Sequence, residues 1–192
     1  MAGFGLSYLT VAPITAETDS AITYGTGLIA EHARRAAMTY NWVEAKLKGD
    51  NKTAEYVAYL EDADLELETT ELDNDVAVMM GLVKARGTGD AIVYQVKTKT
   101  GTPLGAGWIE TLLINDEYIY RGVWVHKITM RQNSTEASTR EDTVNWGTPT
   151  VQGKAWCVMK DSDGEDQIRD YKDFDSEAAA LTWLKGKANI TP

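Results

Sequence analysis

The chain has 192 residues, a formal net charge of −10 and an isoelectric point near 4.7. This length suits one domain with a sizeable core, and the acidic charge argues against a protein that grips nucleic acid through lysine and arginine. The single cysteine, Cys157, excludes an internal disulfide bond. No signal segment is recognisable at the start and the longest apolar runs are much shorter than a membrane span, so we expect a protein that stays soluble in a cytoplasm and enters no membrane.

The first part of the chain predicts strands, with one ambiguous segment. Residues 8–13 are largely apolar and end at Pro13, which is typical of an edge strand, and residues 18–27 are typical of a loop. Apolar residues recur at helical spacing over residues 28–37, whereas residues 37–43 alternate as a strand does. Spacing alone leaves helix and strand both open there.

A polar stretch follows at residues 44–55. It carries charges of both signs around Gly49, Asp50 and Asn51, which are residue types that favour turns. We interpret it as a long hairpin arm between two strands.

Residues 61–72 alternate between apolar and acidic side chains. This period of two is typical of a strand with one face in a core, and Ala63, Leu65 and Leu67 would form that face. The opposite face is predicted to carry a row of carboxylates, those of Asp62, Asp64, Glu66 and Glu68.

A short amphipathic helix is predicted next. Asp73, Asn74 and Asp75 can cap its N-terminus, apolar residues at helical spacing follow over residues 76–83, and later glycines at Gly87 and Gly89 can end it.

The middle of the chain predicts three more strands. Residues 91–98 alternate, residues 101–107 are rich in glycine and predict a turn, and residues 108–114 and 118–130 form a hairpin joined by a tight turn at residues 115–117. The longer strand of this hairpin is predicted to place on one face Tyr118, Tyr120, Trp124, His126 and Ile128.

The last part of the chain predicts a polar loop, a long strand and a closing helix. These are residues 132–142, residues 143–158 and a helix capped by Ser176, with a turn at residues 161–166. Seven to nine strands and two helices indicate a mainly β fold. We therefore predict one domain over residues 1–192, an antiparallel β-sandwich or partial barrel with one flanking α-helix and a short C-terminal helix.

The sequence offers little material for catalysis or for a cofactor. The only histidines are His32 and His126, no nucleophile turn accompanies them, and Cys157 lies in a β run where a small apolar residue would serve equally well. The acidic residues 161–166 differ from a calcium loop in glycine position and lack the distant bidentate glutamate. We expect neither an enzyme nor a metal or cofactor site.

The second half of the chain resembles the major tail proteins of long-tailed siphophages, which build the tail tube. The resemblance lies in a strand that contains Trp124 and Lys127, a polar loop that contains Asn133, and a Thr148-Pro149-Thr150 segment followed by Gly153. The opening strand and the Tyr24-Gly25-Thr26 loop are also similar to that family.

The resemblance implies a structural virion protein of the phage tail. Six copies would form a ring, and stacked rings would form a hollow tube through which phage DNA passes during ejection. The implied partners are further copies of the chain, the tail terminator and tail-tip proteins, and the tape-measure protein in the lumen, with assembly in the host cytoplasm. DNA would pass without specific binding, and we expect the chain to stay monomeric until an initiator is present.

Two candidate surfaces follow from that resemblance. Each subunit would give about four strands to an inner barrel, and the acidic row at residues 62–68 would face the lumen, where it would keep phosphates from sticking to the wall. The alternative is a solvated outer face. Closing six sheets into one barrel removes unpaired strand edges, and the arm is our candidate for contacts between subunits, through Lys48, Gly49, Asp50, Asn51, Lys52 and Thr53.

A monomeric β-sandwich binding module, for carbohydrate or for protein, is the second hypothesis. Six tryptophans are enough to line a sugar platform. Their spread over separate predicted elements and the missing signal segment argue against it. A tube protein of a secretion or contractile system is a third hypothesis.

Overall fold

The computed structural model describes residues 2–30, 33–49, 52–132, 150–160 and 163–191. The fold is mainly β, with antiparallel sheets and two α-helices, as the sequence predicts. The strands of the main sheet are β1 (Ala2–Thr18), β2 (Ala21–Tyr24), β3 (Leu28–Ala30), β4 (Ala33–Gly49), β5 (Lys52–Thr69), β8 (Leu104–Ile114), β9 (Glu117–Gln132), β10 (Thr150–Trp156) and β13 (Arg169–Phe174). Two smaller hairpins are formed by β6 (Val83–Arg86) with β7 (Val93–Val96), joined through the 3-10 turn η1 (Gly89–Ala91), and by β11 (Met159–Lys160) with β12 (Asp166–Gln167).

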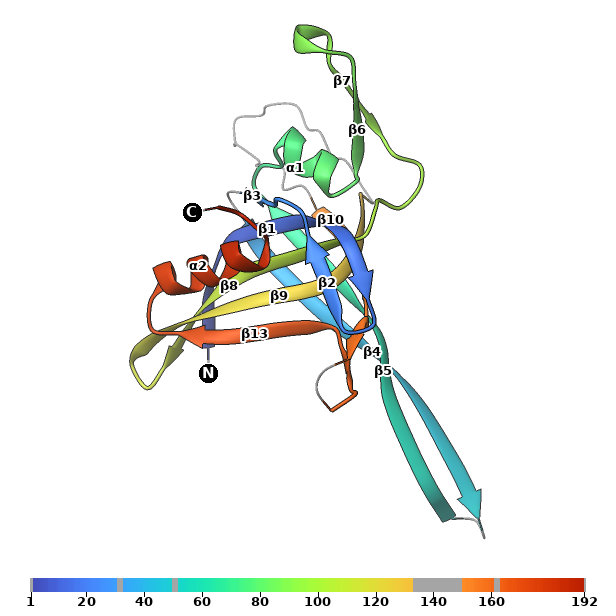
Figure 1. The fold of residues 1–192 in the computed structure, drawn as a ribbon. Helices are drawn as coiled ribbons and strands as arrows, with labels where there is room; N and C mark the ends of the chain where they lie inside the picture. The colour runs from blue at the N-terminus through green and yellow to red at the C-terminus, as the bar shows by residue number, and fades with distance from the viewer. Residues whose placement is uncertain (1, 31–32, 50–51, 133–149, 161–162, 192) are drawn as a thin grey trace, which may run out of the picture.

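The main sheet runs in the order β2-β1-β8-β9-β10-β5-β4. One edge of β9 pairs along β8, and its other edge is shared, first by β13 at residues 120–125 and then by β10 at residues 128–132. The sheet curls so that β1 also lies against β4, and this curl encloses the core (Figure 1).

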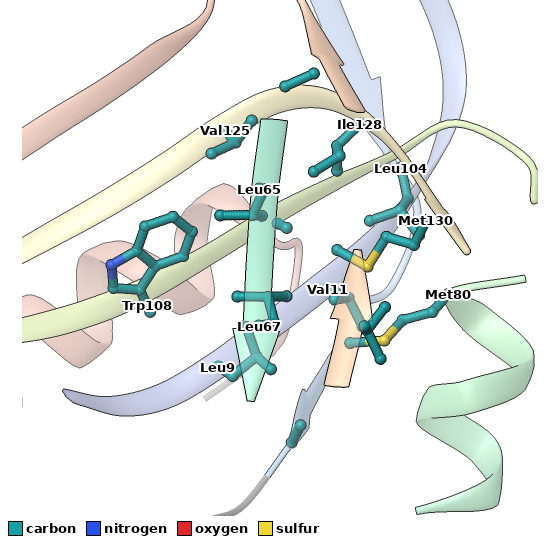
Figure 2. Packing of buried hydrophobic residues seen from close by; sticks show 14 of the residues in the cluster. Leu9, Val11, Leu65, Leu67, Met80, Leu104, Trp108, Val125, Ile128 and Met130 are labelled. Atoms are coloured by element: carbon teal, nitrogen blue, oxygen red, sulfur yellow. The ribbon is translucent and has the colours of Figure 1, made fainter. Parts of the chain in front are cut away.

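The core lies on the inner side of the curled sheet. Figure 2 shows Leu65 and Leu67 of β5 among apolar side chains from β1, β8 and β9, with Met80 approaching from the helical segment beside them. Burying each such side chain contributes about 1.5–3 kcal/mol relative to exposure. The largest members are Leu9, Val11, Leu65, Leu67, Met80, Leu104, Trp108, Ile128 and Met130.

The C-terminal helix α2 (Glu177–Lys187) packs on the opposite face of β8 and β9 around Trp124. The ring of Trp124 lies so close to Gly105 and Gly107 that a Cβ at either position would approach it within 2.5–2.6 Å. These glycines therefore make room for an aromatic ring within β8. The sequence prediction of a turn over residues 101–107 was wrong for residues 104–107, which begin the strand.

Helix α1 (Asn74–Met79) has the predicted N-cap, since the Asp73 carboxylate accepts a hydrogen bond from the Asp75 backbone N–H at 2.7 Å. It ends earlier than predicted, because Gly81 at φ 73° turns the chain and Val83 begins β6. In α2 the predicted Ser176 cap is also present, with its Oγ accepting from the Ala179 N–H. The C-terminal helix is the longer of the two, and it is the one that covers the sheet.

Two predictions for the first forty residues were wrong. Strand β1 is not an edge strand, because it pairs with β8 on one side and with β2 and β3 on the other. The Pro13 carbonyl accepts a hydrogen bond from the Gly25 N–H. The predicted loop at residues 18–27 contains β2.

The described residues of the ambiguous segment, 28–30 and 33–43, are extended. Strand β4 pairs with β5 from Ala33 to Gly49, and β3 pairs with β1. The helical spacing of apolar residues over 28–37 does not produce a helix in the described residues. Cross-strand pairing satisfies the backbone N–H and C=O groups instead, through strands that are distant in the sequence.

The prediction of which β9 side chains share one face was partly wrong. Trp124 lies in the cluster under α2, but Ile128 lies in the main core with Val125. The register shift between β8 and β9 near Leu104 accounts for this, because one extra residue moves the following side chains to the other face. The predicted loop at residues 133–142, the start of the predicted strand at residues 143–149 with Thr148 and Pro149, and His32 lie outside the described residues.

Candidate functional site

The acidic row lies on one face of β5, as predicted. Ala63, Leu65 and Leu67 are buried, and the intervening carboxylates remain at least partly exposed. The face belongs to four adjacent strands, because β4 and β10 flank β5 and β9 flanks β10.

Cross-strand register brings cations to this row. The Arg35 guanidinium on β4 pairs with Glu66 and, at 3.1 Å, with Glu68. The Lys154 ammonium on β10 lies 2.9 Å from Asp62 and 3.7 Å from Asp64. Each cation is thus shared by two carboxylates of the row.

An amide completes the arrangement at the end of the row that Lys154 contacts. The side-chain N–H groups of Asn41 donate to Asp62 at 2.6 Å and to Asp64 at 2.8 Å. This hydrogen bond from Asn41, followed by the contact with Lys154, lowers the pKa of Asp62 below its ordinary value. Conversely, the hydrogen bond to Asp62 raises the pKa of Lys154, and the bonds to Glu68 and Glu66 raise the pKa of Arg35. These shifts favour the charged forms of Arg35, Asp62 and Lys154 at neutral pH.

The face is hollowed into a shallow groove of about 670 Å³. Its lining comes from β4, β5, β9 and β10, with Thr100 at its margin. The charged and aromatic lining residues are Arg35, Asp64, Glu66, Arg131, Lys154 and Trp156.

The charge of this face differs from the one predicted. The sequence suggested a row of carboxylates alone, whereas the fold sets four carboxylates beside Arg35, Arg131 and Lys154. Phosphate groups bind to cations that are not already paired, whereas Arg35 and Lys154 are each paired with two carboxylates. The face is therefore close to neutral, with two of its cations held by acidic partners.

The arm is the part of the β4–β5 hairpin that extends past β10. The last pair between β10 and β5 joins Trp156 to Asp62, and beyond it residues 42–49 and 52–60 pair only across the hairpin. Figure 1 shows it reaching far from the body of the molecule. The backbone pairs Lys48 with Thr53 and Gly49 with Lys52, whereas Asp50 and Asn51 at the tip lie outside the described residues.

One face of the arm is apolar and exposed. The register places Val43 opposite Tyr59 and Ala45 opposite Val57, with Leu47 next along the same face. Val57, Tyr59 and Leu47 are 58%, 56% and 61% exposed. The prediction was directed at the polar tip and missed this apolar face, although the alternation of residues 43–47 carried the signal.

The tryptophans do not gather into a platform in the described part of the chain. Trp108 and Trp124 are buried on opposite sides of the sheet, and Trp42 lies at the base of the arm. Trp183 of α2 packs on Phe174 of β13. Among the tryptophans that the structure describes, Trp156 alone lines the groove.

His126 is a packed residue. It is 2% exposed, and its Nε2 lies 3.1 Å from Asp170 Oδ1, while Lys187 of α2 donates to Asp170 Oδ2 at 2.5 Å. The hydrogen bond with His126 and then that with Lys187 hold the pKa of Asp170 far below its usual range. This cluster ties α2 to β9 and β13.

Cys157 and the calcium-like segment at residues 161–166 are the remaining candidates for chemistry. Burial raises the pKa of the Cys157 thiol, whose Sγ lies 3.6 Å from the Leu60 carbonyl, so the thiol is not activated as a nucleophile. The calcium-like segment joins β11 to β12, with Gly164 at φ 84° in the turn; Asp161 lies outside the described residues. Within the described ranges, His, Cys, Asp and Glu side chains form no group of three or more that could hold a metal ion.

Neither described helix is long and apolar enough to cross a bilayer. Comparison of the sequence with protein-family models found no match, and comparison with curated protein sequences found no significant match.

Proposed function

We propose that this chain is the repeating subunit of a hollow tube, six copies to a ring, and that the tube is a phage tail tube through which DNA passes. The observation that carries the proposal is the four-stranded face of β4, β5, β10 and β9, which is polar, hollowed and almost neutral. A face of this kind suits the inner wall of a channel for a polyanion, because it offers water-compatible groups without a patch of available cations.

The free edge of β4 supports the same proposal. Within the described residues the outer edge of β4 pairs with no strand, so its backbone N–H and C=O groups are open to a neighbour. Natural proteins cover such edges or close them into barrels. In a ring, the edge of one copy would meet the next copy, and closure would leave no edge exposed.

The arm supplies a second argument for self-assembly. Its apolar face is exposed along several residues, which is typical of a surface that becomes buried against a partner. We propose that the arm lies against adjacent copies, with its apolar face as the main contact and the tip at residues 48–53 as the outer part.

The first test is assembly of the purified chain. Without an initiator we expect monomers at low concentration, but high concentration favours association by mass action, so electron microscopy should then show rings or tubes of uniform diameter. The double substitution Val57→Ser with Tyr59→Ser should leave a folded monomer and abolish tubes, whereas Tyr118→Ser, a change at an equally exposed tyrosine on β9, should leave tubes intact. Featureless monomers from the unsubstituted chain at every concentration would overturn the tube.

The second test concerns the wall. Asp64→Lys with Glu66→Lys adds two cations and removes one of the two carboxylates that engage each of Arg35 and Lys154, so tubes should still form but should retain DNA, with an affinity that falls steeply as salt rises. The control is Glu117→Lys with Asp175→Lys, which makes the same charge change at exposed positions elsewhere. Equal DNA retention by both variants would show that the groove does not face the lumen.

The binding-module hypothesis keeps one supporting observation, the presence of Trp156 in the groove. A single aromatic ring beside engaged ion pairs is a small platform for a sugar. A chain that stays monomeric and whose tryptophan fluorescence responds to an oligosaccharide would favour this second function.

A further inference from the structure

The β6–β7 hairpin is a second projection, at the other end of the molecule from the arm. Figure 1 shows it extending past α1 and away from the main sheet. Its strands pair only with each other, and residues 84–100 are exposed throughout. An isolated two-stranded hairpin is at best marginally stable in water, so this element is expected to be completed by a partner.

The hairpin has one apolar face and one cationic face. Val83 is paired with Val96, and Ala85 with Tyr94, so these four side chains share a face on which Val96 is 63% exposed. The other face carries Lys84 and Arg86 opposite Gln95 and Val93. Over residues 83–99 the cations are Lys84, Arg86, Lys97 and Lys99, against one carboxylate, Asp90.

This cationic segment is unusual in a chain of net charge −10. None of its four cations forms an ion pair with another described residue. Because the hairpin carries net positive charge, the rest of the chain is more acidic than the net charge of the whole chain indicates. A second copy can therefore offer an acidic surface to this hairpin.

A matching surface lies beside α1. There, β3 and the start of α1 form a groove of about 370 Å³ with apolar side chains from Leu28, Ile29 and Val76. Three carboxylates, those of Glu71, Asp73 and Asp75, line the same groove, and no described cation pairs with any of them. Apolar surface flanked by carboxylates is the complement of apolar surface flanked by cations.

We propose that the β6–β7 hairpin of one copy docks into the β3–α1 groove of the next copy of this chain. The hairpin cannot reach its own groove in the conformation described, because it projects away from β3 (Figure 1). The two surfaces differ, so the contact is heterologous and repeats from copy to copy, which generates a ring or a filament. The inference rests on the proposed self-assembly and names a contact in it that is separate from the arm and the edge of β4.

The test is a charge exchange between the two surfaces. Lys84→Glu with Arg86→Glu gives a chain whose hairpin and groove are both acidic, and Glu71→Lys with Asp75→Lys gives a chain in which both are cationic. Asp73 is left unchanged because it caps α1. Each variant alone should raise the concentration needed for assembly by about tenfold or more.

The decisive measurement is a mixture of the two variants. In an equimolar mixture every acidic hairpin can meet a cationic groove and every cationic hairpin an acidic groove, so assembly should return to wild-type concentrations with the two chains alternating. Circular dichroism and thermal unfolding of each variant check the fold. A control with two cations changed elsewhere, the exposed Lys172 and the half-buried Lys185, as Lys172→Glu with Lys185→Glu, should assemble as wild type.

The outcomes separate this contact from the tube itself. A wild-type chain that never assembles overturns the proposed function and this contact with it. If the wild type assembles, either of two results overturns the hairpin–groove contact and leaves the proposed tube intact. In the first, each variant alone assembles as well as the wild type. In the second, the variants are folded but their mixture does not assemble.

Discussion

Strand β5 belongs to two different environments along its length. In the body of the molecule Leu65 and Leu67 are each 2% exposed, whereas in the arm Val57 on the same strand is 58% exposed. Both halves keep the same β4 partner. The difference is that the body has a second layer to pack against and the arm has none, so hydrogen bonding shapes both halves while burial stabilises only one.

The comparison teaches where stability and where association reside. Apolar side chains in the body are already buried, so truncating them should lower the free energy of unfolding. Apolar side chains in the arm are exposed in the single copy, and their loss should leave the fold intact and change only what the chain binds.

The largest expected effect is in the body. Leu65→Ala removes a fully buried side chain between β1 and β9 and should lower the free energy of unfolding by about 2–5 kcal/mol. Urea denaturation of the purified monomer measures this change. A loss as small as that of an exposed residue would mean that the enclosed side of the sheet is not the core.

A smaller effect is expected where α2 joins the sheet. Asp170→Asn removes the charge that binds His126 and Lys187, and it should cost about 1–2 kcal/mol after allowance for its partial exposure. Because the folded pKa of Asp170 lies below its unfolded value, its contribution is complete above the unfolded pKa and is lost as pH falls below about 4. Denaturation curves of the wild type should therefore lose more stability between neutral and acidic pH than those of Asp170→Asn; identical losses would contradict the assignment.

The smallest effect on stability is expected in the arm. Val57→Ser alone should change the free energy of unfolding by no more than about 0.5 kcal/mol, because the side chain buries little surface in a single copy. The same substitution should reduce assembly measured by sedimentation. A destabilisation comparable to that of Leu65→Ala would show that the arm folds back onto the body in solution, and would remove the distinction between the two halves of β5.

Much of the fold could be predicted from local patterns. The alternation at residues 61–69, the Asn115–Asp116 turn between β8 and β9, the two helix caps and the mainly antiparallel character all depend on neighbours within a few residues. Residues 28–43 could not be predicted, since their helical spacing competes with a pairing to β5 that is visible only in three dimensions. The second projection was also missed, because residues 82–99 predicted a helix end and a strand but not the partner that makes them a hairpin.

The candidate site shows the same division. The chain itself determined that the carboxylates of residues 62–68 share one face, because side chains alternate along any extended strand. Only the tertiary structure decided what stands beside them: Arg35 and Lys154 are far from that row in the sequence, and the register of β4 and β10 sets them against it. Local order follows from the period of the backbone, whereas the charge of a surface depends on which distant strands become neighbours.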